Sequence, residues 1–283
     1  MSEPTGVYLE ASRDLAGAAI VIQGVPYDGG TSYRAGARAA PDEIRAASQS
    51  IETYSPRLRR DLEDLSYADA GDLSLAGLDA AAVMETIAAA TEALLREGRV
   101  VVSLGGDHSV SIGTTEGSRR ARDRVAHIVF DAHLDMRPSY DGSELSHACG
   151  TRHMAKAGPT VALGIRSGSR EEFADAASML TYWSEEVSLP PAVRAELEGR
   201  PVHLSIDLDV LDPSILPGTG TPEPGGPNYK ELREAVLALA GLDIVAVDLV
   251  EVAPPLDASG VSTVVAAELV REIILALPPG AAG

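Results

Sequence analysis

The sequence has a single cysteine, few aromatic residues and only two lysines. Its 283 residues include one Cys, at position 149, and aromatic residues make up 4% of the chain. One cysteine excludes a disulfide within the chain and is typical of a reducing compartment. We expect Cys149 to be a packed side chain, because no activating partner is apparent. With so few aromatic residues, the core must consist mainly of Ala, Val, Leu and Ile.

Positive charge is scarce as well. The chain carries 23 Lys and Arg against 42 Asp and Glu, which gives a net charge of -19. This balance argues against binding to nucleic acid or to an anionic membrane surface and is compatible with a small cationic substrate. Because the acids are scattered, adaptation to a salty cytoplasm explains the charge equally well. The sequence shows no basic-then-apolar leader and no apolar run of membrane-spanning length, so we expect a cytoplasmic protein.

Short apolar runs alternate with helical patterns along the chain. The runs expected to be strands are 18–25, 66–70, 100–104, 125–131, 160–165, 180–183, 202–209 and 244–252. The helical patterns cover 41–48, 78–97, 170–177, 192–198, 229–240 and 261–277. Strands too apolar to face water on either side indicate a parallel sheet covered by helices on both faces. We therefore predict an α/β fold, a single three-layer α/β/α domain over residues 1–283 with a mainly parallel sheet of about eight strands.

Histidines and carboxylates gather where four of these predicted strands end. They are His108, then Asp131, His133 and Asp135, then Asp207 and Asp209, and finally Glu251. The carboxyl ends of the strands in an open α/β sheet are the usual place for a site. Carboxylates and imidazoles crowded there would repel one another or stay unpaired unless a cation lies among them.

The type of ligand suggests which metal this is. Mixed nitrogen and oxygen ligation suits Mn²⁺ and leaves Zn²⁺, Fe²⁺, Ni²⁺ and Co²⁺ open. The first six residues of that set are more than one ion needs, so the pattern predicts a two-ion site for hydrolysis, in which Asp131 and Asp207 bridge the ions. The alternative is a satisfied buried polar network without metal, which six ligands at matching strand ends disfavour.

Three motifs carry a family resemblance. They read GGDHS at 105–109, DAHLD at 131–135 and SIDLDVLDP at 205–213. With these motifs, the chain resembles the ureohydrolase family (arginase, agmatinase and relatives). Further stretches similar to the family's pattern lie at 24–26, 34–38, 71–73, 164–166 and 218–223, so the resemblance covers nearly the full length.

The resemblance implies hydrolysis of a guanidinium group to urea and an amine, with two Mn²⁺ per chain. One ion would take His108, Asp131, Asp135 and Asp207, and the other Asp131, His133, Asp207 and Asp209. The resemblance also makes Asp135 the group that orients the nucleophile and relays its proton, and Glu251 the carboxylate that receives the guanidinium. His147 would lie at the start of a helix at the mouth of the site and act as a proton shuttle, the alternative being an ordinary surface histidine. The family assembles as homo-trimers or homo-hexamers.

The stretch 136–147 bears on which substrate is used. It departs from the Asn/Ser/Thr-rich loop of arginases, and Asp141 and Glu144 within it would suit a substrate that has a distal amine and no carboxylate. Segments 146–148, 251–257 and 51–56 are similar to agmatinase sequences. The prediction is therefore agmatine, hydrolysed to putrescine and urea for polyamine biosynthesis. Guanidinobutyrate, arginine, guanidine and other guanidino acids stay open, because Arg137 and Arg152 are possible carboxylate partners.

Two functions from other classes are alternatives. A deacetylase-like enzyme of the same general fold would use a single ion, and the presence of both His108 and Asp209 argues against it. A catalytically silent oligomer subunit would have lost ligands, and none of the predicted ligands is missing.

Overall fold

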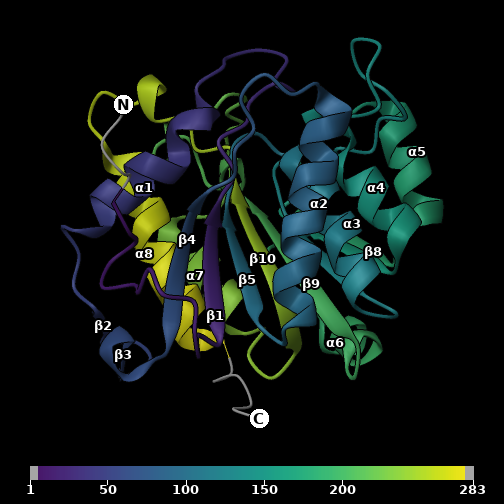
Figure 1. Ribbon diagram of the computed structural model, residues 1–283. Helices are drawn as coiled ribbons and strands as arrows, with labels where there is room; N and C mark the ends of the chain where they lie inside the picture. The colour runs from purple at the N-terminus through teal and green to yellow at the C-terminus, as the bar shows by residue number, and fades with distance from the viewer. Residues whose placement is uncertain (1–5, 278–283) are drawn as a thin grey trace.

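The computed structural model describes residues 6–277, which are built around one eight-stranded sheet (Figure 1). The predicted domain range 1–283 extends beyond the described residues at both ends. In sheet order the strands are β4 (Tyr67–Asp72), β1 (Ile20–Gly24), β5 (Val100–Leu104), β10 (Asp243–Val250), β9 (Pro201–Asp207), β6 (Ala126–Phe130), β7 (Thr160–Leu163) and β8 (Tyr182–Ser184). Every pairing in this sheet is parallel, so the predicted sheet is confirmed. A separate antiparallel pair, β2 (Tyr54–Ser55) and β3 (Arg60–Asp61), was not predicted.

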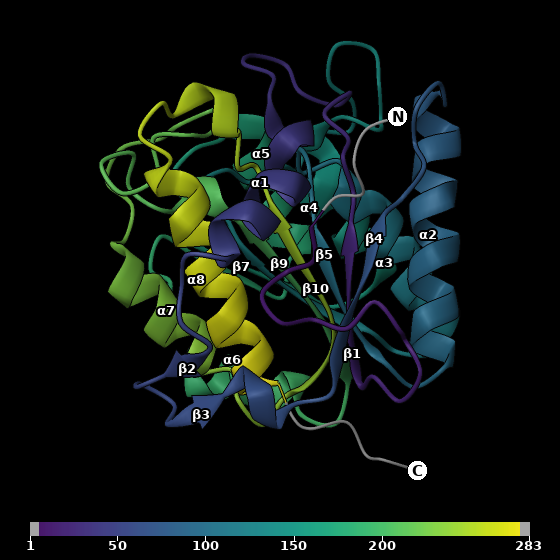
Figure 2. The ribbon, with the colours of Figure 1, turned by 60° about the vertical axis from the view of Figure 1, so that its left-hand side comes forward.

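Helices cover both faces of the sheet, which makes the three layers (Figure 2). The helices are α1 (Ala40–Ser48), α2 (Ala80–Arg96), α3 (Val110–Ala121), α4 (Gly150–Ala157), α5 (Arg170–Met179), α6 (Pro191–Leu197), α7 (Tyr229–Leu237) and α8 (Val261–Ala276). On one face α2 packs on α3 and α3 on α4, and on the other α1 and α7 both pack on α8. Among the described residues, no helix combines the length and the apolar character needed to cross a membrane.

The local sequence explains these elements. The strand β6 has the sequence AHIVF and is buried at every position, as a central strand between two helical layers must be. The helix α2 buries Val83, Ile87 and Leu95 along one stripe, and Asp79 caps its first turn by accepting the N–H of Ala82. Ser169 and Glu172 form a capping box at the start of α5.

The helix α3 was missed by the sequence-based prediction. Its sequence, VSIGTTEGSRRA, is rich in β-branched residues and glycine, which are poor helix formers, and its large apolar residues are Val110 and Ile112 alone, too few to mark a helical repeat. The helix owes its position to close packing on α2. A Cβ atom at Gly113 would lie 2.7 Å from Ile87 Cβ, and one at Gly117 would lie 2.6 Å from the Ala88 carbonyl oxygen. Tertiary contact therefore outweighs local propensity here.

Two predicted strands end earlier than expected, and this affects the site. The strand β9 ends at Asp207, and Leu208–Val210 form a 3-10 turn that contains Asp209. The strand β10 ends at Val250, so Glu251 follows the strand in the left-handed region, with φ of 65°. A non-glycine residue in this region is uncommon and often marks a functional position.

Candidate active site

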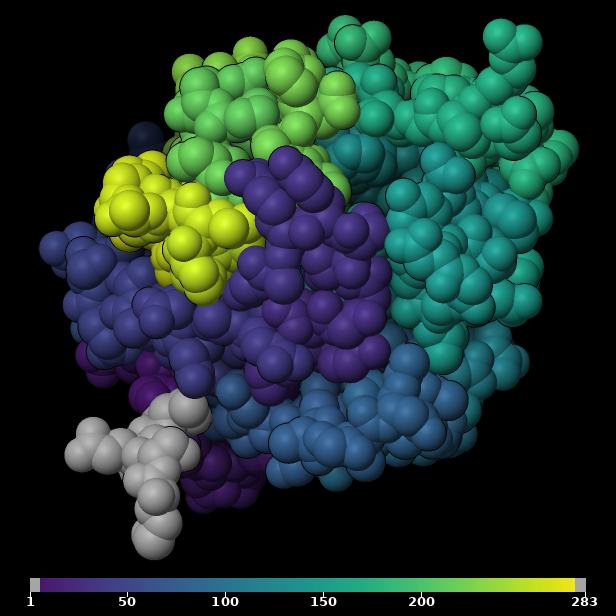
Figure 3. All heavy atoms as spheres, turned by 90° about the horizontal axis from the view of Figure 1, so that it is seen from above, coloured from purple at the N-terminus to yellow at the C-terminus, as the bar shows by residue number. Residues whose placement is uncertain are grey.

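The four strands that carry the predicted site residues are neighbours in the sheet, in the order β5, β10, β9 and β6. His108 follows β5, Glu251 follows β10, Asp207 ends β9 and Asp131 follows β6. Because all four strands are parallel, their carboxyl ends meet at one edge of the sheet. Figure 3 looks down on the molecule from above the view of Figure 1, and the segments after β1, β6 and β9 crowd together there.

The loop that delivers His108 depends on a glycine. A Cβ atom at Gly106 would lie 1.5 Å from the Tyr27 carbonyl oxygen, so no other residue fits this backbone path. The same carbonyl accepts the N–H of Asp107 at 2.9 Å. The motif at 105–109 is thus held against the segment that follows β1, with His108 fixed at the start of α3.

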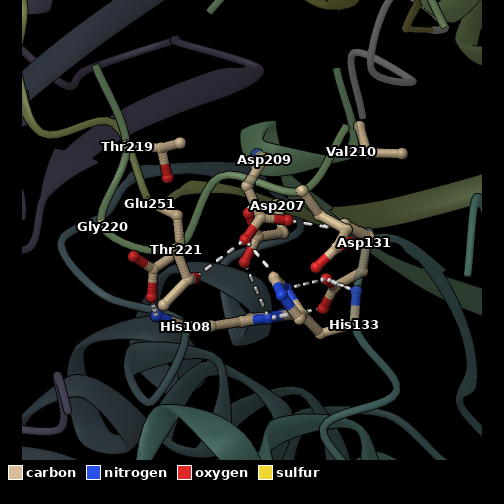
Figure 4. A network of polar contacts seen from close by, with 12 residues as sticks. His108, Asp131, His133, Asp207, Asp209, Val210, Thr219, Gly220, Thr221 and Glu251 are labelled. Atoms are coloured by element: carbon tan, nitrogen blue, oxygen red, sulfur yellow. Dashed lines mark hydrogen bonds and ion pairs between the residues drawn. The ribbon is translucent and has the colours of Figure 1, made fainter. Parts of the chain in front are cut away.

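His108 faces three carboxylates, of which Asp131 and Asp207 are labelled in Figure 4. Its Nδ1 lies 3.0 Å from Asp131 Oδ2, 3.0 Å from Asp135 Oδ2 and 3.2 Å from Asp207 Oδ2. On the far side of the ring, Nε2 lies 3.1 Å from Ser205 Oγ. All of these side chains are buried. The contact of Nε2 with Ser205 therefore orients the ring, and Nδ1 faces the carboxylate cluster.

His133 makes the second half of the cluster. Its Nδ1 lies 3.0 Å from Asp209 Oδ2 and 3.6 Å from Asp131 Oδ1. Asp131 thus directs one oxygen toward each histidine. Asp209 Oδ2 also accepts a hydrogen bond from the Thr221 hydroxyl at 3.2 Å, and Asp207 Oδ1 accepts the N–H of Asp209 at 2.8 Å.

The electrostatics of the cluster are those of a cation site. Burial and Asp131 raise the pKa of Asp135, and burial, Asp209 and Asp131 raise the pKa of Asp207. Burial acts against protonation of His108, but its contacts with the three carboxylates still raise its pKa well above the ordinary value. The cluster would otherwise have to hold protons to relieve repulsion, which a divalent cation relieves directly.

The residues fit a pair of divalent metal ions. Ligand atoms of His108, Asp131 and Asp207 lie within 4.8 Å of one another, as do those of Asp131, His133 and Asp209. Buried His108 Nδ1 and Asp131 Oδ2 lie 3.0 Å apart, but neither makes a hydrogen bond of regular geometry within the described chain, a state that is costly without a ligand. The two groups share Asp131, as a bridged pair of ions requires.

Glu251 lies at the edge of this cluster. Its side chain is buried, and Oε1 accepts the backbone N–H of His108 at 2.7 Å. Burial raises the pKa of Glu251 well above its ordinary value, with further contributions from Asp107 and Asp209. A buried carboxylate that burial and neighbouring negative charges disfavour in its ionised form is suited to binding a cation.

His147 occupies the predicted place, at the start of a 3-10 turn (His147–Cys149) that leads into α4. Its Nε2 lies 2.8 Å from Ser32 Oγ, and its Nδ1 lies 3.9 Å from Glu251 Oε1. Burial lowers the pKa of His147. Cys149 is buried next to it, and burial raises the pKa of its thiol, in line with a packed side chain.

A cavity of about 350 Å³ opens over the cluster. Its polar wall residues are Ser32, His133, Asp135, Arg137, Tyr140, His147, Ser167, Ser169, Glu172 and Thr221. Sequence reasoning did not single out Ser32, Tyr140 or Glu172 as site residues. Glu172 comes from α5, and only its capping-box position distinguished it in the sequence.

Two predicted substrate-binding residues lie elsewhere. Asp141 is exposed, with φ of 48°, and borders a separate cavity of about 160 Å³ rather than the one over the cluster. Glu144 is exposed, and its carbonyl oxygen lies 3.0 Å from His153 Nε2. Neither side chain lines the cavity over the cluster, whereas Tyr140, at the start of the same loop, does. The geometry does not support direct contact between these carboxylates and a substrate held at the cluster.

Comparisons with known proteins find relatives that match most of the chain. The sequence model described as the arginase family matches residues 18–276. The agmatinase of Bacillus anthracis is 40% identical over 276 residues, which cover 95% of each chain. The N(1)-aminopropylagmatine ureohydrolase of Thermococcus kodakarensis is 37% identical over 242 residues, covering 81% of this chain and 83% of that one. The crystal structure of agmatine ureohydrolase of Thermoplasma volcanium, 31% identical, superposes with a TM-score of 0.87 and covers 97% of this chain and 95% of that one.

Proposed function

The chain belongs to the arginase family, and from that premise we propose that it hydrolyses agmatine to putrescine and urea. The observation that carries the proposal is the similarity to an agmatinase along nearly all of both chains. The carboxylate-rich site agrees with it, because the group to be cleaved is a guanidinium cation. The product is a diamine, so the reaction would serve polyamine biosynthesis.

The proposed cofactor is a pair of Mn²⁺ ions. His108, Asp131, Asp135 and Asp207 would hold one ion, and Asp131, His133, Asp207 and Asp209 the other. When bound, the ions would lower the pKa of a water molecule toward neutrality and so supply the nucleophile. Other divalent ions suit the same ligands, since nitrogen and oxygen donors are shared among several metals.

The protein's own residues would bind the substrate and move its protons. Glu251 is proposed to accept N–H groups of the guanidinium at its free oxygen, Oε2, because Oε1 is engaged by His108. Asp135 is proposed to take the proton of the attacking water and deliver it to the leaving nitrogen. His147 is proposed to exchange protons with solvent, and its lowered pKa keeps it neutral and able to accept one.

The wall of the cavity would contact the part of the substrate that lies away from the guanidinium, here called the tail, and so would select between substrates. Arg137 is the arginine on the cavity wall, and its Nε lies 3.5 Å from Glu172 Oε2 while its guanidinium lies 5.0 Å from the Tyr140 ring centre. Because the negative charge of Glu172 partly neutralises the Arg137 guanidinium, the wall would repel a cationic tail only weakly. A guanidino acid is the second candidate, since Arg137 could also meet a carboxylate. Arg152, the other possible partner, is paired with Asp175 at 2.6 Å and does not line the cavity.

Assembly and location complete the proposal. A cytoplasmic homo-trimer or homo-hexamer is proposed, from the resemblance to the family and the composition of the chain.

The test is urea release by Mn²⁺-loaded protein from agmatine, 4-guanidinobutyrate, arginine and guanidine. We expect selective turnover of agmatine. Selective turnover of the guanidino acid would replace agmatine with the second candidate and assign Arg137 to its carboxylate. Lack of turnover with Mn²⁺, Zn²⁺, Fe²⁺, Ni²⁺ and Co²⁺ would contradict the proposed function.

A further inference from the structure

The loop that follows β1 contacts the proposed proton shuttle, and the proposed chemistry gives this loop no role. Ser32 Oγ lies 2.8 Å from His147 Nε2, although the two residues are 115 positions apart in the sequence. Ser32 is exposed, whereas the side chain of His147 is only 12% exposed. Both line the cavity over the cluster, so the hydroxyl meets the ring where this cavity opens to solvent.

The contact with Ser32 decides how the His147 ring is turned. The other ring nitrogen, Nδ1, lies 3.9 Å from Glu251 Oε1, which is too long for a hydrogen bond. The Tyr140 ring stands nearly perpendicular to the imidazole, with the ring centres 6.4 Å apart. Of these three contacts, the one with Ser32 has the length of a hydrogen bond. It directs Nε2 toward the loop and leaves Nδ1 facing the carboxylate of Glu251.

Gly30 joins this loop to two other parts of the site. Its N–H donates to Asp107 Oδ2 at 2.7 Å, and its carbonyl oxygen accepts the backbone N–H of His147 at 3.3 Å. The Ser146 hydroxyl donates to the same carbonyl oxygen at 3.3 Å. The backbone contacts of Gly30 therefore fix where the Ser32 hydroxyl meets the imidazole.

The close approach of this loop requires a glycine at position 30. A Cβ atom at Gly30 would lie 2.6 Å from Ser109 Oγ and 3.0 Å from Asp107 Oδ1. Asp107 Oδ2 also accepts the Thr31 hydroxyl at 3.3 Å. Asp107 is fully buried and directly precedes His108, a proposed metal ligand. The loop is thus bound to the segment that carries this ligand, so one edge of the sheet sets the positions of both.

A hydroxyl group suits a contact with a residue that gains and loses a proton. A serine hydroxyl can donate to Nε2 when that nitrogen carries no proton and can accept from it when it does, by rotation about the Cβ–Oγ bond. The contact between Ser32 and His147 can therefore persist while the imidazole takes up or releases a proton. A methyl group could do neither, and a carboxylate could only accept.

We propose that Ser32 is a positioning residue that acts through His147. Its hydroxyl holds the imidazole in the orientation from which the ring exchanges protons with the site. The inference rests on the proposed function, which assigns proton exchange to His147, and adds to it a residue from the loop after β1.

The first experiment is urea-release kinetics of the Mn²⁺-loaded full chain with agmatine. Ser32→Ala should lower kcat by about 2–12-fold, the effect of one lost hydrogen bond, and leave KM and metal content unchanged. Ser32→Thr keeps a hydroxyl at this exposed position and should restore most of kcat. Ser50→Ala is the matched control and should leave kcat unchanged, because Ser50 is an exposed serine after α1 whose hydroxyl donates to the Ala47 carbonyl oxygen at 2.7 Å.

A double variant tests whether Ser32 acts through His147. His147→Ala removes the ring, and adding Ser32→Ala to it should lower kcat no further, because the contact is already lost. Losses that multiply in the double variant would overturn the proposal. An unchanged kcat in Ser32→Ala would overturn it too, as would a raised KM alone, which would assign Ser32 to substrate binding.

Crystal structures of the unaltered chain and of Ser32→Ala test the inference apart from the function on which it rests. The His147 ring should take one orientation in the unaltered chain, with Nε2 at Ser32 Oγ, and more than one in the variant. If the unaltered chain releases no urea from any of the guanidino compounds named above, the proposed function is wrong, and the ring orientations still test the positioning. If urea is released and the ring is equally well ordered in both structures, only the positioning role is wrong.

Discussion

Glu251 Oε1 accepts the backbone N–H of His108 at 2.7 Å, so the proposed guanidinium-binding carboxylate and a proposed metal ligand are joined directly. The bond spans two neighbouring strand ends, those of β10 and β5. Glu251 lies in the left-handed backbone region, and its side chain points toward His108 beside the cluster (Figure 4). Substrate binding and metal binding thus depend on one rigid edge of the sheet.

Glu251→Gln should separate these two roles. Glutamine keeps an oxygen that can accept the His108 N–H, so metal content should be unchanged. It removes the charge that meets the guanidinium, and the loss of a charge-assisted hydrogen bond of about 1.5–3 kcal/mol lowers kcat/KM by roughly 10–150-fold. Metal analysis together with urea-release kinetics checks both parts. Unchanged kinetics would remove Glu251 from substrate binding.

Asp131→Ala and Asp207→Ala should each abolish urea release and remove at least one ion per chain. Asp131 belongs to the ligand groups of both histidines and Asp207 to the group of His108, and each is proposed as a ligand of both ions, so either loss would affect both ions. The measurement is metal content by elemental analysis, with activity on the same sample. Asp243→Ala is the control, because Asp243 is exposed at the opposite end of β10. Full metal content and activity in either variant would contradict a bridged two-ion site.

The strands and the side chains that gather at their carboxyl ends could be predicted from the sequence because their signals are local. An apolar run that ends in Asp or His identifies both a buried strand and the side chains at its carboxyl end. The order of the strands is not local: β5 and β10 are neighbours although 138 residues separate Leu104 from Asp243. Long-range packing also brings Arg137 close to Glu172 and sets the path of the loop that carries Asp141. The cavity wall could therefore not be predicted.

Arg137→Gln should shift selectivity toward cationic substrates. The guanidinium on the cavity wall repels a distal ammonium and attracts a carboxylate, although Glu172 and solvent weaken both effects. An interaction of about 0.5–1 kcal/mol predicts a roughly 2–5-fold change in the ratio of kcat/KM for agmatine to that for 4-guanidinobutyrate. Arg170→Gln, at an exposed arginine that starts α5 and does not line the cavity, is the control. An unchanged ratio would show that this wall does not contact the tail.

Gly117→Ala should destabilise the protein even though alanine is the better helix former. Helix propensity favours the change by about 1 kcal/mol. Against this, the new Cβ would lie 2.6 Å from the Ala88 carbonyl oxygen and 2.8 Å from Thr91 Cβ, so α2 and α3 must move apart. Overpacking of this kind costs about 1–3 kcal/mol and should exceed the gain. Urea unfolding measures the difference, and a higher free energy of unfolding in the variant would contradict close packing of these helices.

Asp248→Asn should reduce the amount of folding free energy that the metal-free protein loses when the pH is lowered. The pKa of Asp248 is lower in the folded chain than in the unfolded one. Such an acid contributes stability at pH values above its unfolded pKa, and this contribution is lost as the pH falls through the folded value. The difference in free energy of unfolding between the unaltered chain and the variant should therefore shrink as the pH falls, and denaturant unfolding at a series of pH values measures it. The raised pKa values of Asp135 and Asp207 act in both proteins, so they cancel in the difference. A difference that does not change with pH would show that Asp248 is not held as a buried anion.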